Sequence, residues 1–202
     1  MALPEHPTNL DALGKWFFAR QTISHNPAVV YPLLYQNLLI AQGLLSASNL
    51  ERQRLGLVVA RYSAITARLN LQDYLIDARI CEAFLIPYLA IAYPENGHTV
   101  SRRQILEDTY NAYAGTRDIA HQVTTLLFLL RYADSPNTKN WTRMMLARSY
   151  EDAKNYGQAI AFLKTTQPID TAWMTRLQKE QAVKNPQMPL PVQTASPKGP
   201  RS

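Results

Sequence analysis

The side chains that most often carry catalytic or metal chemistry are few in this chain and stand far apart. None of its four histidines lies at a metal-ligand spacing from a second histidine, a cysteine or a carboxylate that forms a known signature. They are His6, His25, His98 and His121. His121 follows Asp118 by three residues in an apolar stretch. This setting favours a hydrogen-bonded core or boundary histidine over a catalytic one, which would need a positioned second group.

The single cysteine, Cys81, lies beside Glu82 and four residues after Asp77. A lone cysteine in an apolar helix is typically a small buried hydrophobe, and no histidine is placed to activate it. The pairs Glu107-Asp108 and Glu151-Asp152 are adjacent in sequence, so they point to different sides of a helix and are interpreted as solvated surface. The glycines are scattered singly, so no phosphate-binding loop is present. We therefore predict no enzymatic activity, no cofactor and no metal site.

The elements that must position these residues are predicted to be helices. Apolar residues recur at spacings of three and four over most of the sequence, and strict alternation is hard to find. The fold class is therefore all-α, built of antiparallel helical hairpins. The expected helical segments run from 9 to 24–27 and over 29–46, 49–70, 71–93, 99–115, 118–133, 141–166 (a hairpin) and 170–184. Pro87 is expected to bend or interrupt its helix, and the apolar run at 126–130 to be central.

Composition divides the chain into two regions. At 202 residues and 47% hydrophobic, it is long enough for one domain or one short repeat array with a buried core. From Asn185 onward five prolines occur with almost no large apolar residue, and such a segment cannot offset its own ordering entropy. We predict a helical domain over 1–184 and a disordered, Pro-rich, basic tail over 185–202.

Charge and hydropathy limit the partners. The net charge is +6, and about half of the excess lies in the acid-free segment 184–202, which leaves too little on the body for a nucleic-acid footprint. The uncharged stretch from Gln21 to Leu50 is interrupted by Pro27, Pro32 and amide side chains, so no run reaches the ~18–20 apolar residues of a membrane span. One cysteine and a start without a signal sequence predict a cytoplasmic location.

The segment from Trp141 to Gln167 has the spacing of a known repeat. Ala147 is followed by Tyr150 three residues later, and Tyr156 is followed by Ala159 and Leu163 at steps of three and four. This pattern resembles the tetratricopeptide repeat, a helix–turn–helix unit of 34 residues. Three positions depart from the family pattern. They are Arg143, Thr166 and the early proline Pro168.

The resemblance covers about 30 of the 202 residues. The stretch from Ile105 to Leu130, 34 residues upstream, matches poorly, with Tyr113 where a small residue is expected. The upstream region is interpreted as tetratricopeptide-like hairpins in a divergent α-solenoid, and an irregular helical bundle remains the alternative. In the resembled family the first helix of each repeat lines a concave groove. The resemblance therefore implies a partner-binding surface on one helix face at Trp141, Met144, Arg148 and Asp152.

These observations predict a non-enzymatic adaptor or assembly subunit that binds another protein through a groove of helical hairpins. The first alternative is a peripheral helical subunit of a membrane-associated complex, because the uncharged stretch is long and only 18% of the residues are charged. An enzyme of an all-helical class is the third alternative.

Overall fold

The computed structural model describes residues 24–184, and 79% of them are helical. The prediction of an all-α fold is confirmed. Within that range no strand is present, and one isolated bridge pairs Tyr93 with Ser101. The helices in chain order are α2 (Pro27–Leu45), α3 (Leu50–Leu71), α4 (Tyr74–Ile80), α5 (Arg102–Thr116), α6 (Ile119–Tyr132), α7 (Pro136–Asp152), α8 (Tyr156–Leu163) and α9 (Thr171–Lys184). The helix expected from residue 9 and the tail over 185–202 lie outside the described residues.

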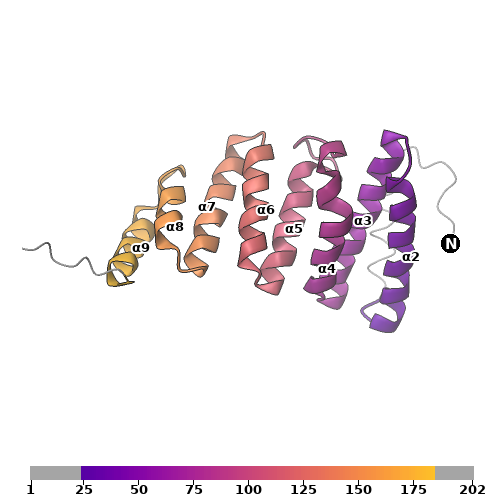
Figure 1. Ribbon diagram of the computed structural model, residues 1–202, viewed down its shortest axis with the longest axis horizontal. Coiled ribbons are helices and arrows are strands. Elements are labelled where there is room, and N and C mark those ends of the chain that lie inside the picture. Colours follow the sequence, from indigo (N-terminus) through magenta and orange to yellow (C-terminus); the bar gives the residue numbers. More distant parts are fainter. Residues whose placement is uncertain (1–23, 185–202) are drawn as a thin grey trace, which may run out of the picture.

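The helices stand side by side in an elongated row, with α2 at one end and α9 at the other (Figure 1). Each helix packs chiefly against the helices that precede and follow it in the sequence. Apart from residues 81–101, which separate α4 from α5, the connections are short, so successive helices run antiparallel and the chain progresses along the row without returning.

A residue with a short polar side chain caps the N-terminus of most of the helices. Asn49 accepts hydrogen bonds from the amides of Glu51 and Arg52, and Ser101 and Asp118 do the same for α5 and α6. These side chains satisfy amide groups that have no partner inside the helix. The sequence therefore predicts most helix starts within a few residues.

The helix expected over 71–93 is interrupted around Pro87, one of the two outcomes that the sequence predicts. The α-helix ends at Ile80, a π-helical turn occupies Cys81–Leu85, and a 3₁₀ helix follows over Ile86–Ile91. The proline ring has no amide hydrogen and collides with the carbonyl four residues earlier, so the disturbance lies largely before the proline. The predicted helix 71–93 is thus three shorter pieces, and Leu71 itself belongs to α3.

Two other expectations need correction. The turn expected at 134–140 is shorter, because α7 begins at Pro136, where a missing amide hydrogen costs nothing. The run 126–130 is only half covered: Leu126 and Leu129 are buried, whereas Leu127 is 44% and Phe128 38% exposed. A helix inside a row packs on both neighbours and leaves its outer face to solvent.

The apolar core is unevenly distributed. One large cluster extends from α2 to Leu129 of α6 and includes the fully buried Leu57, Leu85 and Leu106. The α7–α9 end has a smaller cluster around Ala147, Ala159 and Leu177. The first half of the described chain therefore has the deeper core.

One described helix, α2, is long and apolar enough to cross a membrane by length and composition alone, and 28% of that span is buried in the fold. Helices in the cores of water-soluble proteins meet the same criterion. The predicted absence of a membrane span therefore stays a prediction.

Candidate functional site

The four residues predicted to bind a partner share one exposed stripe of α7. Trp141 is 38% and Met144 37% exposed, and Arg148 and Asp152 are exposed as well. Their spacing of three and four residues places them along one side of the helix. The other side is committed to packing, and the buried residues of α7 are Thr138, Thr142, Leu146, Ala147 and Ser149.

The helices on either side add aromatic rings to this stripe. The ring of Trp141 meets the ring of Tyr110, on α5, edge to face at 6.1 Å and 85°. The guanidinium of Arg148 lies 5.9 Å from the ring centre of Trp173, on α9. Three alternate helices therefore form one surface, which we call the α5–α7–α9 face. Its residues are Tyr110, Trp141, Met144, Arg148, Asp152 and Trp173.

Trp141 is both packed against the core and exposed to solvent. Its edge contact with the buried Tyr110 anchors the indole to the core, and more than a third of the side chain stays in solvent. An indole that packs against the protein on one side and is exposed to solvent on the other is typical of protein interfaces.

The charges of α7 converge near Tyr110. Burial raises the pKa of the Tyr110 hydroxyl, the charge of Asp152 raises it further, and the charge of Arg148 partly offsets both. Arg148 and Asp152 therefore lie within electrostatic reach of the same hydroxyl, and the neutral phenol persists across the physiological pH range.

Glu151 fixes the position of Trp173, which sequence reasoning missed. The indole Nε1 donates to Glu151 Oε2 over 2.7 Å, and Arg176 forms an ion pair with Glu151 at 2.7 Å. Burial acts to raise the pKa of Glu151, but the bonds from Arg176 and Trp173 outweigh it and the pKa is lowered. The interpretation of Glu151-Asp152 as solvated surface is thus wrong for Glu151. Its place four residues after Ala147, on the packed side of α7, was the available signal.

A second polar cluster lies inside the N-terminal half and was not predicted. Arg61 pairs with Asp108 at 2.6 Å, and Arg68 reaches both Asp108 at 3.2 Å and the fully buried Asp77 at 3.3 Å. The network joins α3, α4 and α5. Arg61 and Arg68 are two helical turns apart on α3, and that spacing could have indicated two cations on one face. Asp108, interpreted from sequence as solvated, is 8% exposed.

Cys81 adjoins this network but is not equipped as a nucleophile. Its Sγ lies 3.6 Å from Asp77 Oδ1, and the side chain is fully buried. Burial and the nearby charge of Asp77 raise the pKa of the thiol well above its usual value. A thiol kept protonated is unreactive, which agrees with its interpretation as a small buried side chain.

Asp77 is the most perturbed carboxyl of the network. Burial raises its pKa to about 7, the charge of Arg68 lowers it, the charge of Asp108 raises it and the bond from Cys81 lowers it. No cavity opens onto this carboxyl among the described pockets, which lie at α8 and α9. The group is therefore interpreted as part of the fold.

His121 lies on the surface and not in the core. Its Nδ1 is 2.7 Å from Asp118 Oδ2, and its ring stacks on Tyr113 at 4.9 Å. The side chain is 55% exposed. The histidine belongs to the first turn of α6, which Asp118 caps. Across residues 24–184, no group of three or more His, Cys, Asp or Glu side chains could hold a metal ion.

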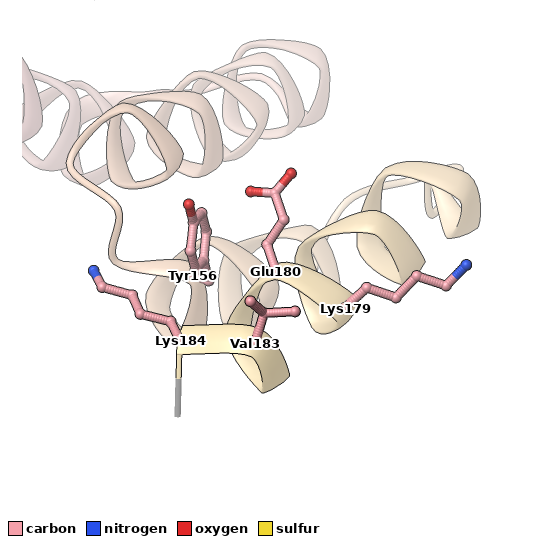
Figure 2. Close-up of a pocket in the computed structure, with 5 residues that line it drawn as sticks. All are labelled: Tyr156, Lys179, Glu180, Val183 and Lys184. Atoms are coloured by element: carbon pink, nitrogen blue, oxygen red, sulfur yellow. The ribbon is translucent and has the colours of Figure 1, made fainter. Parts of the chain in front are cut away.

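A shallow hollow of about 480 Å³ lies between the start of α8 and the end of α9. Figure 2 shows Tyr156 and Glu180 rising toward the same side, while the ammonium groups of Lys179 and Lys184 point away in opposite directions. Its fifth lining residue, Val183, is 82% exposed. None of the five side chains is fully buried, so the hollow lacks the fixed, converging polar groups of a small-molecule site.

Comparison with protein-family models, with curated proteins and with solved structures found no match to this chain.

Proposed function

We propose that this chain is a non-enzymatic adaptor or assembly subunit that binds a segment of another protein along the α5–α7–α9 face. One observation carries the proposal: Trp141 and Arg148 of α7 and Trp173 of α9 share one surface in contact with solvent, and Trp141 rests on the buried Tyr110 of α5. Tyr, Trp and Arg are the residues that most often dominate binding energy at protein interfaces. Here Trp141 and Trp173 flank Arg148.

The proposal includes a tetratricopeptide-like architecture. It is supported by the α7–α8 hairpin, in which Ala147 and Ala159 are both fully buried in one cluster with Leu163. Tyr150 and Tyr156 pack beside them. Small residues at both positions let the two helices approach closely. The row of helices that contact mainly their sequence neighbours is also the arrangement expected of stacked repeats.

The face is prepared for binding because its side chains are held in place before a partner arrives. Trp173 is fixed by Glu151, and Trp141 rests on Tyr110. Fixed aromatic side chains lose little conformational entropy on binding, which leaves more of the contact energy for affinity. Met144, half-exposed between them in the stripe, adds an adaptable apolar contact.

Site-specific photocrosslinking tests the proposal. A benzophenone amino acid at Met144 should crosslink a discrete protein partner in the cell of origin. The same probe at Leu127, an exposed apolar residue of α6, is the control and should not. Equal crosslinking at the two positions, or none at Met144, would contradict the proposal.

A matched pair of arginines separates the face from general charge effects. Arg148 lies 5.9 Å from the ring of Trp173, and the exposed Arg131 lies at the same distance from the ring of Tyr132, on α6. Arg148→Glu should abolish crosslinking from Met144, whereas Arg131→Glu should leave it intact. Loss in both variants would point to net charge instead of this surface.

A further inference from the structure

The outward side of α2 carries a regular stripe of exposed residues. The helix packs chiefly against α3, and its buried residues are Val30, Leu34, Asn37, Ala41 and Leu45. On the opposite side, exposed residues follow one another at steps of four, three, four, three and four positions. They are Ala28, Pro32, Tyr35, Leu39, Gln42 and Ser46, which we call the α2 seam. Tyr35 and Leu39, at its centre, are 66% and 51% exposed.

The α2 seam has the spacing along which one helix packs against another. Alternating steps of three and four residues are the pattern of a coiled-coil contact. The mean step of 3.5 residues keeps the same side of a helix turned toward its partner over several turns. All six seam residues stay exposed within residues 24–184, so no helix in that range occupies this position. The seam is therefore suited to one further helix.

The side chains of the seam match their own reverse order. In an antiparallel pair of α2 helices centred between Tyr35 and Leu39, each Tyr35 would lie opposite Leu39 of the other copy. The outer pairs would be Pro32 with Gln42 and Ala28 with Ser46. The two largest apolar side chains thus meet at the centre, and the two smallest meet at the ends. A second copy of α2 fills this seam without leaving a bulky residue opposite a bulky one.

The absence of charge on α2 favours the same occupant. No residue of the helix from Pro27 to Leu45 is charged. A two-fold contact places the same surface on both sides, so charges near the axis would face like charges. Helices that lie on lipid surfaces typically carry Lys and Arg beside their apolar side, and α2 has neither. Charge therefore favours a second α2 over a membrane surface.

The opposite end of the row argues against a head-to-tail contact. Leu177 is the one buried residue of α9, and apart from Val183 the exposed positions of that helix carry polar, charged or small side chains. The two helices lie at opposite ends of the described row (Figure 1). A contact of α2 with α9 of the next copy would set apolar groups against this polar surface and would not close. A contact of α2 with α2 closes after two copies.

We propose that two copies of this chain associate through the α2 seam, antiparallel, about a two-fold axis between Tyr35 and Leu39. One helix against its copy buries less than the roughly 800 Å² per partner of a standard interface. We therefore expect a reversible dimer with a Kd in the micromolar range.

Sedimentation velocity on the full chain tests the proposal. We expect the mass of two chains at high micromolar concentration and the mass of one chain after dilution. Tyr35→Glu and Leu39→Lys, each alone, should raise the Kd by about tenfold or more, because each sets charges against an apolar contact on both sides of the axis. Leu127→Glu, at an exposed apolar position of α6, is the control and should leave the Kd unchanged.

The double variant Tyr35→Glu with Leu39→Lys tests the register. In the antiparallel pair the new carboxylate of each copy lies opposite the new ammonium of the other, so association should be restored. In a parallel pair like charges would meet, and the double variant would stay monomeric. Far-UV circular dichroism should show the same helix content in all variants, because both positions are exposed.

Four results would overturn the proposal. A chain that is monomeric at every concentration would assign the seam to another occupant, and this includes residues 1–23, which are present in the experiment. A monomer that binds phosphatidylcholine–phosphatidylglycerol vesicles through Tyr35 and Leu39 would assign it to a lipid surface. A dimer that survives both single substitutions would lie elsewhere on the chain. A dimer that the double variant does not restore would exclude the antiparallel register.

Discussion

The two halves of the row are stabilised in different ways. From α2 to α5 a large apolar cluster surrounds an ion network in which Arg61, Arg68 and Asp108 are each at most 13% exposed. From α7 to α9 the clusters are smaller, and the ion pair between Arg176 and Glu151 is more exposed, at 51% and 22% of the two side chains. Buried charges tie helices together only where every partner is present, whereas surface charges remain available to a ligand. The first half thus resembles a scaffold, and the second offers a surface.

The largest expected effect is the loss of Asp108. Asp108→Ala removes the carboxylate shared by Arg61 and Arg68 and leaves both guanidinium groups partly unpaired inside the fold. We expect the free energy of unfolding to fall by about 3–5 kcal/mol, as measured by urea denaturation. The neighbouring Glu107→Ala is the control, because its ion pair with Arg103 is more exposed and should cost less than about 1 kcal/mol. Equal losses would remove the distinction between buried and surface pairs.

The next effect is a pH dependence specific to the first half. The pKa of Asp77 is about 7 in the fold, against an ordinary value of 3.8. Between those values the folded state holds a proton that the unfolded state has released, so stability falls as pH rises from about 4 to about 7. We expect a loss on the order of 1–4 kcal/mol over this window, measured by denaturation at each pH.

Asp77→Asn should flatten that slope. Glu151, in the second half, has the opposite sign, because its pKa is lowered. Its contribution is present above an ordinary pKa of 4.5 and is lost as pH falls below it. A slope between pH 4 and 7 that survives in Asp77→Asn would place the titrating group elsewhere.

Replacing one glycine in each half with alanine tests how tightly the two halves are packed. A Cβ at Gly56, in α3, would lie 2.8 Å from Leu45 Cγ and 3.0 Å from the backbone oxygen of Ala41. We expect Gly56→Ala to destabilise the protein by about 1–3 kcal/mol. At Gly157, in α8, the nearest atom is Gln181 Nε2 at 3.5 Å, and Gly157→Ala should stabilise by about 0.5–1 kcal/mol through helix propensity. Thermal unfolding of both variants would show shifts of opposite sign.

The smallest expected effect on stability is at Arg148. Its contact with Trp173 is exposed, so Arg148→Glu should change the free energy of unfolding by no more than about 1 kcal/mol. The same substitution should weaken partner binding, which calorimetry can measure once a partner has been identified. A large fall in stability would mean that this arginine belongs to the scaffold.

The sequence by itself determined most of the helices and their order. The signals for these helices are local: apolar spacing, capping residues such as Asn49 and Asp118, and prolines at helix starts. They act through hydrogen bonds and backbone geometry within a few residues along the chain. The sequence also determined the exposed stripe of α7, because Ala147 and Tyr150, which pack the hairpin, indicate which side is packed.

Only the tertiary structure decided which residues of other helices contact that stripe. Tyr110 and Trp173 are more than 20 residues from Arg148, and no spacing rule joins residues on helices two places apart in the row. The same holds for the network of Arg61, Arg68, Asp77 and Asp108, whose carboxylates look like ordinary solvated groups in the sequence. Burial depends on which helices pack together, and the periodicity of one helix does not contain that information.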